Sequence, residues 1–532
     1  MTTPAPVPER DSRDHFDVQH LRNDLAGRAV RGAGWTIASQ ALSICITIAG
    51  TIILARLLVP TDFGLVAMAS STVGIIQVFS DGGLGLATMQ RGSLTHAQVS
   101  TLFWANVALS AACGAAIAAA GPAVSLFFGD ERLTEVTFAI GTLVALGGLG
   151  VQHTALLRRQ MRFRALAWIQ VVSALTGLSV SITMAGMGFG YWALVANNAV
   201  PALVWIPMSW MLCGWRPGLP RRGVGAWRLM RFGGAASLAG VANYVSRNAD
   251  NVLIGKFLGD GPLGTYDRAY QLMVKPVLKA NAPITAVLAP ALSRLGDDPK
   301  RYQAACVGVF RVMAYCAAPP AVALAVFAEE TVALLLGAAW MDAVEPFRWL
   351  SLACAAQIVT QQAGQMFLAQ GCGRLLLRYS VLNAATVTCA FAAGLPWGIS
   401  GVAFSYAMTY VLVCVPLLAW MLARTPRLEF RPIARVVFPG VMLAAFLCML
   451  LPMLRRLVEP AIGQLSAGAV AIGALVAIYA LLLTSTSDGR AASNDVLRAI
   501  AKFRQRGRHN PPPSAPAPAA VSYTHLTLPT KA

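Results

Sequence analysis

The chain has 532 residues, of which 56% are hydrophobic and only 12% are charged. Because ordinary soluble domains carry about a quarter charged residues, this composition excludes a soluble globular protein. Apolar runs long enough to cross a bilayer recur between residues 33 and 484. The net charge of +19 could suggest nucleic acid, but Lys and Arg gather in short loops on one side of the apolar runs. This is the positive-inside pattern of membrane proteins, and no nucleic-acid partner is expected.

Residues 1–32 are polar and charged, without a cleavable signal peptide. They contain an amphipathic stretch at 16–30 that we expect to lie on the inner leaflet. The apolar runs predict an all-α polytopic membrane protein with about fourteen transmembrane helices. The expected spans are 33–55, 64–81, 99–121, 134–157, 166–186, 189–213, 233–257, 268–292, 303–327, 346–370, 378–398, 401–423, 432–454 and 464–484. Six spans thus fall in 33–213, six in 233–423 and two in 432–484.

The distribution of Lys and Arg predicts that both termini are cytoplasmic. Residues 485–520 are charged and then rich in proline, which predicts a disordered cytoplasmic tail. Residues 521–532 match nothing before them. They look like translated adapter sequence, and we expect them to be non-native.

Two segments that lie 200 positions apart, residues 53–64 and 253–264, share one chemical pattern. Each contains a cation (Arg56, Lys256), then an apolar trio, and then an apolar residue followed by Gly. A membrane chain built from two related halves is the usual sign of a transporter whose site lies between them.

Polar side chains mark one face of the seventh span. Asn243, Arg247 and Asn251 step by four residues, and Asp250 lies beside them. A charge inside a span costs about 2.5–3.5 kcal/mol on insertion scales, so it needs a partner or an aqueous cavity. Arg247 and Asp250 could form a closed ion pair within the helix, or both could line a cavity.

The eighth span repeats the four-residue step with Gln271, Lys275 and Lys279, and Arg311 follows on the ninth span. With the arginine of the seventh span, these cations outnumber the single acid Asp250. The surplus favours a cavity that attracts anions. A structural role for the lysines and an interfacial position for Arg311 are the alternatives.

Other residues in the spans are candidates for bending or for sugar binding. Pro276 is followed at seven-residue intervals by Pro283 and Pro290, and each removes a backbone hydrogen bond. The eighth helix could therefore hold static bends or change its bend during transport. Gln361 and Gln365 lie one turn apart and could bind sugar hydroxyls.

Motifs for enzymes and metal sites are missing from the sequence. It contains no GxxxxGK[ST] phosphate loop, its six histidines are scattered, and its ten cysteines form no CxxC pair. We therefore expect no catalytic residues, no metal and no cofactor.

Three segments, in this order and spacing, carry a family resemblance. They are 54–65, then 248–259 continuing through 263–266 and 269–270 to Pro276, and finally 336–340 with 346–348. The sequence resembles the Wzx-type oligosaccharide flippases, in the polysaccharide biosynthesis (PST) family of the MOP exporter superfamily. It is most similar to the exopolysaccharide branch.

The resemblance implies two pseudo-symmetric six-helix lobes around a central cavity, with two peripheral helices, in the bacterial inner membrane. The implied substrate is an undecaprenyl-pyrophosphate-linked oligosaccharide, flipped for exopolysaccharide or lipopolysaccharide biosynthesis. The polymerase and glycosyltransferases of the same pathway are the implied partners, besides membrane lipids. In this hypothesis Lys279 and Arg311 receive the pyrophosphate from inside, and Lys275 holds it mid-membrane with Arg247. Asp250 would neutralise Arg247 in the empty carrier.

Three other classes of protein remain as alternatives. A drug or cation antiporter of the same superfamily would need acidic residues in its spans, and only Asp250 is well placed. A membrane-embedded polysaccharide polymerase would be expected to present a long outer loop with paired Arg or His, whereas the outer loops here are short. A purely structural membrane protein would not need lysines inside its spans.

Overall fold

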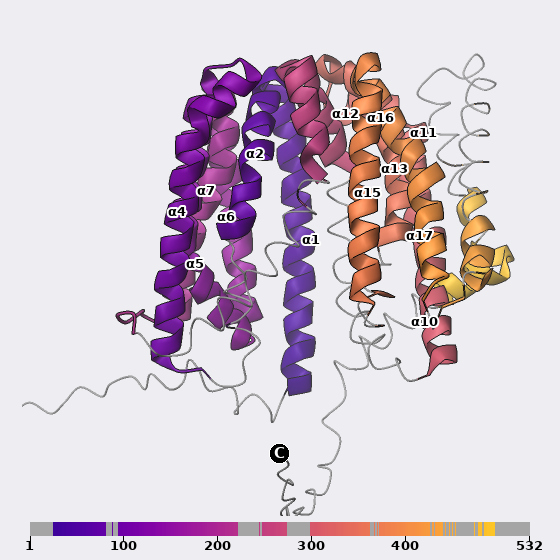
Figure 1. The fold of residues 1–532 in the computed structure, drawn as a ribbon, viewed down its shortest axis with the longest axis horizontal. Helices are drawn as coiled ribbons and strands as arrows, with labels where there is room; N and C mark the ends of the chain where they lie inside the picture. Colours follow the sequence, from indigo (N-terminus) through magenta and orange to yellow (C-terminus); the bar gives the residue numbers. More distant parts are fainter. Residues whose placement is uncertain are drawn as a thin grey trace, which may run out of the picture.

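The computed structural model describes residues 25–80, 94–221, 247–273, 298–361, 372–425, 431–439 and 483–494, with isolated residues and short stretches between them. All regular structure in these segments is helical. Figure 1 shows one group of helices from the first half of the chain and another from the second half, joined at one end. Most of the predicted span region 432–484 lies outside the described residues, as do residues 1–24 and 495–532.

The described part of the first half contains six long helices. These are α1 (Leu25–Leu57), α2 (Pro60–Ser80), α4 (His96–Phe128), α5 (Arg132–Arg159), α6 (Phe163–Gly186) and α7 (Tyr191–Cys213). They coincide with the six spans predicted for this region, but several are longer. Helix α4, for example, begins at a capping box formed by Thr95 and Gln98 and ends at the left-handed Gly129. Caps of this kind, rather than the apolar run alone, decide where a helix ends.

The second half begins with helical residues 247–258 and 260–273. Further along the chain, residues 299–326 and 398–422 each form a long helix that contains one π-helical turn. Such turns are frequent at functional sites. The further elements are α10 (Pro299–Val312), η2 (Met313–Ala317), α11 (Ala318–Val326), α12 (Ala328–Leu335), η3 (Ala338–Ala343), α13 (Val344–Gln361), α15 (Gly373–Gly394), η4 (Leu395–Trp397), α16 (Gly398–Thr409), η5 (Tyr410–Cys414) and α17 (Val415–Leu422).

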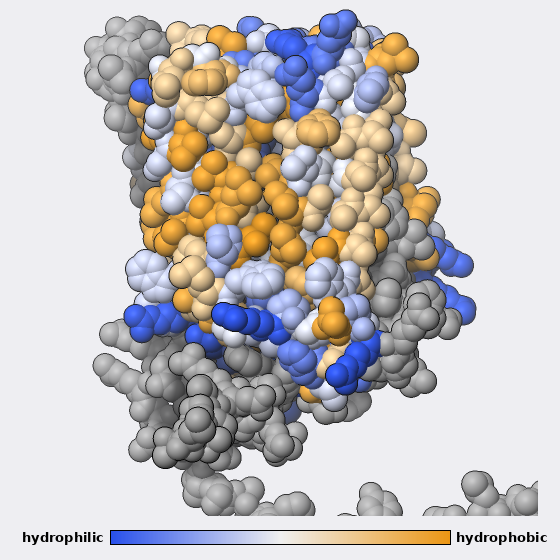
Figure 2. Space-filling view, turned by 90° about the vertical axis from the view of Figure 1, so that its left-hand side faces the viewer, coloured by the Kyte–Doolittle hydropathy of each residue, from blue (hydrophilic) through white to orange (hydrophobic). Residues whose placement is uncertain are grey.

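The surface is that of a membrane protein. Six helical segments of the described chain are long and apolar enough to span a bilayer, among them Gly34–Leu57, His96–Phe128 and Arg132–Arg159. Figure 2 shows an apolar band on the first half, between two zones of hydrophilic residues. Large apolar side chains such as Trp104, Phe138 and Trp168 are exposed, as is expected where lipid replaces water.

The two halves meet through a reciprocal pair of glycines. A Cβ atom placed on Gly64 would lie 1.8 Å from the carbonyl oxygen of Asp260, and one placed on Gly264 would lie 1.8 Å from that of Pro60. Each glycine of the repeat therefore packs on the first residue of the equivalent helix in the other half. We call the end of the bundle that holds these four residues the closed end.

The cations of the repeat make equivalent contacts at the closed end. Arg56 donates a hydrogen bond to the carbonyl oxygen of Leu334 (2.6 Å), near the C-terminus of α12. Lys256 donates to the carbonyl oxygen of Phe127, near the C-terminus of α4. A cation is favourable at such a terminus because the last carbonyls carry partial negative charge. Through the repeated motif, each half thus binds the C-terminal end of a helix in the other half. We call these two contacts of Arg56 and Lys256 the clasp.

Candidate functional site

A cavity of about 640 Å³ lies between the two halves, within the usual size range of ligand pockets, roughly 300–1,000 Å³. Helices α1, α2, α6 and α7 form one wall, and residues 247–271 form the other. The first-half wall has no charged residue among its described lining residues. Its polar members include Thr47, Thr51, Gln170, Ser173, Asn197 and Asn198.

The second-half wall holds every charged residue among the described residues that line the cavity. Its polar and charged members include Arg247, Asn248, Asp250, Asn251, Asp267, Arg268 and Gln271. Two arginines and two aspartates therefore face a space whose opposite wall offers amides and hydroxyls.

Four of the residues predicted from the sequence lie on this wall: Arg247, Asp250, Asn251 and Gln271. Others lie outside the described residues, namely Asn243, Lys275, Pro276, Lys279 and Gln365. Gln361 ends helix α13, but its side chain is outside the described part.

Arg311 lies away from the described lining of the cavity. Its Nε atom is 3.2 Å from a carboxylate oxygen of Asp488. Nearby, Tyr315 and Ala492 belong to one buried cluster. Residues 487–494 lie in the segment predicted to be a disordered tail, yet they are helical because they pack on this part of α10 and η2.

Asp250 is 3% exposed and is held by neutral donors. The Tyr266 hydroxyl donates to its Oδ2 atom (3.2 Å), and the backbone N–H of Asn251 donates to its Oδ1 atom (2.9 Å). Within the described residues, no ion pair joins Asp250 to Arg247. One carboxylate oxygen thus bonds to the helix of residues 260–273, and the other accepts from the backbone of its own helix.

Sequence reasoning missed Asp267 and Arg268. An ion pair joins the two side chains (2.7 Å), and Gln271 donates a hydrogen bond to the same carboxylate (2.6 Å). The predicted span began only at residue 268, which makes both residues interfacial. The repeat held the signal that could have found them, since α2 begins at Pro60 and the offset of 200 places the equivalent start at Asp260.

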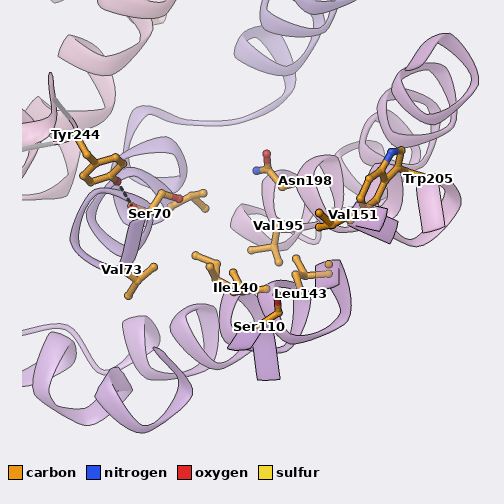
Figure 3. A pocket seen from close by; sticks show the side chains of 14 residues that line it. Ser70, Val73, Ser110, Ile140, Leu143, Val151, Val195, Asn198, Trp205 and Tyr244 are labelled. Carbon is orange, nitrogen blue, oxygen red and sulfur yellow. Dashed lines mark hydrogen bonds between the residues drawn. The ribbon is translucent and has the colours of Figure 1, made fainter. Parts of the chain in front are cut away.

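A second cavity, of about 500 Å³, adjoins the first and lies within the first half. Figure 3 shows that most of its labelled side chains are apolar, such as Ile140, Leu143 and Val195. Ser70 and Asn198 line both cavities. Tyr244 reaches this pocket from the second half and donates a hydrogen bond to the carbonyl oxygen of Ser70 (2.8 Å).

A helical membrane bundle with two related halves around a polar cavity has the architecture of a secondary transporter. Residues 53–345 match the family described as polysaccharide biosynthesis protein. Since this match covers more than half of the sequence, the chain belongs to that family. The sequence-based prediction of the family and of an all-α polytopic membrane fold is confirmed.

Curated relatives agree with this assignment. The chain is 22% identical to the lipopolysaccharide biosynthesis protein WzxC of Escherichia coli (strain K12), over 68% of this chain and 73% of the relative. It is 25% identical to the succinoglycan biosynthesis transport protein ExoT of Rhizobium meliloti (strain 1021), over 87% of this chain and 94% of the relative.

Solved structures show the same fold. The inward closed conformation of the lipid II flippase MurJ matches with a TM-score of 0.65 at 10% identity, over 88% of this chain and 99% of that one. An inward-facing multidrug resistance MATE transporter of the MOP superfamily matches with a TM-score of 0.57 at 16% identity, over 73% and 94%.

Proposed function

We propose that the protein flips undecaprenyl-pyrophosphate-linked oligosaccharide repeat units across the bacterial inner membrane by alternating access. The product would serve exopolysaccharide or lipopolysaccharide biosynthesis. The observation that carries the proposal is the cavity between the halves, which has one charged wall and one neutral polar wall. The names of the relatives WzxC and ExoT support the same class of substrate.

The chemistry of the walls suits the two polar parts of this substrate. Asn and Gln amides both donate and accept hydrogen bonds, as sugar hydroxyls do, so Asn197 and Gln170 can hold the glycan. A guanidinium group matches phosphate oxygens bidentately, so Arg247 and Arg268 can hold the pyrophosphate. Lys275 and Lys279 continue the four-residue step from Gln271 and would add cations on the same helical face.

The position of the closed end indicates from which side of the membrane the cavity can be reached. With both termini in the cytoplasm, the closed end faces the outer leaflet, because α1 ends there. The glycan would then enter the cavity from the cytoplasmic side, while the lipid tail stays in the bilayer between the halves. Separation of the halves at the closed end would release the glycan outward. Contact with the polymerase and glycosyltransferases of the pathway remains a prediction.

The charges of the cavity favour a flippase over a cation antiporter. An antiporter needs a carboxylate that can exchange its cation, but Asp267 is already paired with Arg268 at 2.7 Å. Asp250 has no ion pair within the described residues, but the wall carries as many arginines as aspartates, and the two lysines expected on the eighth span would make its net charge positive, which favours an anionic substrate.

The test is a flipping assay in proteoliposomes that contain an undecaprenyl-pyrophosphate-linked oligosaccharide. The double variant K275Q/K279Q should abolish translocation and still insert normally, because the headgroup loses two charge-assisted contacts. Lys300, which is exposed at the start of α10, provides the matched control K300Q. Undiminished flipping by the double variant would refute the cationic site, and an inactive wild-type protein would refute the function.

A further inference from the structure

Arg268 belongs to the second-half wall of the cavity and also contacts the first half. Its guanidinium is paired with Asp267, and the two side chains are only 12% and 10% exposed. The guanidinium carbon also lies 4.4 Å from the ring centre of Phe63, which belongs to α2 in the first half. Arg268 therefore makes a cation–π contact across the boundary between the halves.

Phe63 leads from this contact to the closed end. Its ring meets the indole of Trp340 edge to face, with 5.3 Å between the ring centres. Trp340 is fully buried, and its indole N–H donates to the carbonyl oxygen of Ala55 (2.7 Å). Ala55 lies in the last turn of α1, directly before the turn that leads to Pro60. A continuous line of contacts thus joins the cavity to the clasp.

Arg268 has a choice of partners when an anion enters the cavity. A phosphate group offers charge-assisted, bidentate hydrogen bonds, which are stronger than a contact with a ring face. Asp267 keeps the hydrogen bond from Gln271 if Arg268 turns away, so its carboxylate is not left without a donor. The Nε atom of Arg268 is buried without a hydrogen-bond partner in the present arrangement, which also favours a change of partner.

We propose that Arg268 couples occupancy of the cavity by a phosphate-bearing headgroup to opening of the closed end. The bound anion draws the guanidinium away from Phe63. The edge-to-face contact between Phe63 and Trp340 then weakens. With it weakens the hydrogen bond from Trp340, in η3, to the carbonyl oxygen of Ala55 at the end of α1. The inference rests on the proposed function for the nature of the anion. Coupling of this kind requires a differential contact in the two states, and Arg268 supplies one.

Hydrogen–deuterium exchange in nanodiscs tests the proposal, with undecaprenyl pyrophosphate as the probe. In wild-type protein the lipid should raise exchange in peptides that cover residues 54–66 and 258–266. The expected change is roughly 2- to 30-fold, the range that corresponds to one cation–π contact. Peptides far from the closed end, such as those of residues 163–180, should not respond.

The variant F63L should show the raised exchange without any lipid and no further response when the lipid is added, since the arginine has no ring to leave. The control F138L removes a ring that faces lipid, 62% exposed, and should respond as wild type does. If F63L folds poorly, R268K serves instead. Lysine keeps the charge but lacks the planar guanidinium, so the response should shrink.

A wild-type protein that binds the lipid without any change at the closed end overturns the coupling. So does an F63L variant that responds like wild type. In either case flipping by the wild-type protein would still support the proposed function. A wild-type protein that neither binds nor flips the lipid would overturn both.

Discussion

The two halves of the chain contribute alike to the closed end and unlike to the cavity. At the closed end Gly64 and Gly264 make mirror contacts with the first residues of each other's helices. Arg56 and Lys256 each donate a hydrogen bond to a carbonyl oxygen near the C-terminus of a helix in the other half. In the cavity, by contrast, the described first-half wall is neutral and the second-half wall carries the charges.

This difference indicates how a duplicated scaffold is divided between motion and recognition. Reciprocal contacts at the closed end suit two halves that rock against each other. A substrate with an anionic end and a neutral glycan has no such symmetry, so a symmetric cavity would recognise only one part of it. Symmetry is kept where the halves must meet and is lost where they meet the substrate.

Removing a charge from the second-half wall should have the largest effect of the tests that address this comparison. We expect R247Q to lower the flipping rate at limiting substrate by about 10- to 150-fold, because a hydrogen bond to a charged group contributes about 1.5–3 kcal/mol. The variant N197A on the neutral wall removes an uncharged hydrogen bond and should cost only about 2- to 12-fold.

Both rates are to be divided by the amount of inserted protein in the same vesicles. Equal losses in R247Q and N197A would show that the difference in charge between the walls does not matter for transport.

The sequence predicted the parts of the fold that depend on local composition. Apolar runs located the helices, and the 200-residue repeat indicated two related halves. The four-residue step of polar residues pointed to Arg247, which lies on the cavity wall, while its role there stays a prediction. Asp267 and Arg268 were missed because hydropathy alone ends a span at the nearest charge, whereas the helix in the structure begins earlier, at residue 260.

Contacts between distant segments were beyond sequence reasoning. Arg311 pairs with Asp488, which lies in a segment whose composition predicts disorder. No periodicity links two residues so far apart in the chain. The roles of Arg56 and Lys256 were hidden for the same reason, since their partners are backbone carbonyls that any residue type provides.

Overpacking the closed end should have the next largest effect. G64A and G264A each place a Cβ atom within 1.8 Å of a carbonyl oxygen, and overpacking of this kind costs about 1–3 kcal/mol. Because the contacts are reciprocal, we expect the two variants to destabilise the closed end equally. Exchange of backbone amides in residues 54–66 and 258–266 measures the effect.

The control for this pair is G34A in α1, because a Cβ placed on Gly34 would meet no atom of the described residues within 4 Å beyond its chain neighbours and its own helix backbone. Alanine in a helix should be neutral or slightly stabilising there. Unequal effects of G64A and G264A would mean that the closed end is less symmetric than the contacts indicate.

The smallest effect is expected from the one ion pair between side chains that the described residues show across the closed end. Arg132 lies 3.2 Å from Asp260 and 2.6 Å from Asp130, with side chains 47%, 30% and 21% exposed. Exposed pairs contribute at most about 1 kcal/mol, so R132Q should raise exchange at the closed end only slightly, and high salt should reduce the difference.

The hydrogen bond from Arg132 lowers the pKa of Asp130 below its ordinary value of 3.8. A lowered carboxyl pKa stabilises the folded state above that ordinary value, and the contribution is lost as the pH falls below it. Acid should therefore destabilise the turn between α4 and α5 more in the wild type than in R132Q, and equal acid sensitivity of amide exchange at this turn in the two proteins would contradict this account.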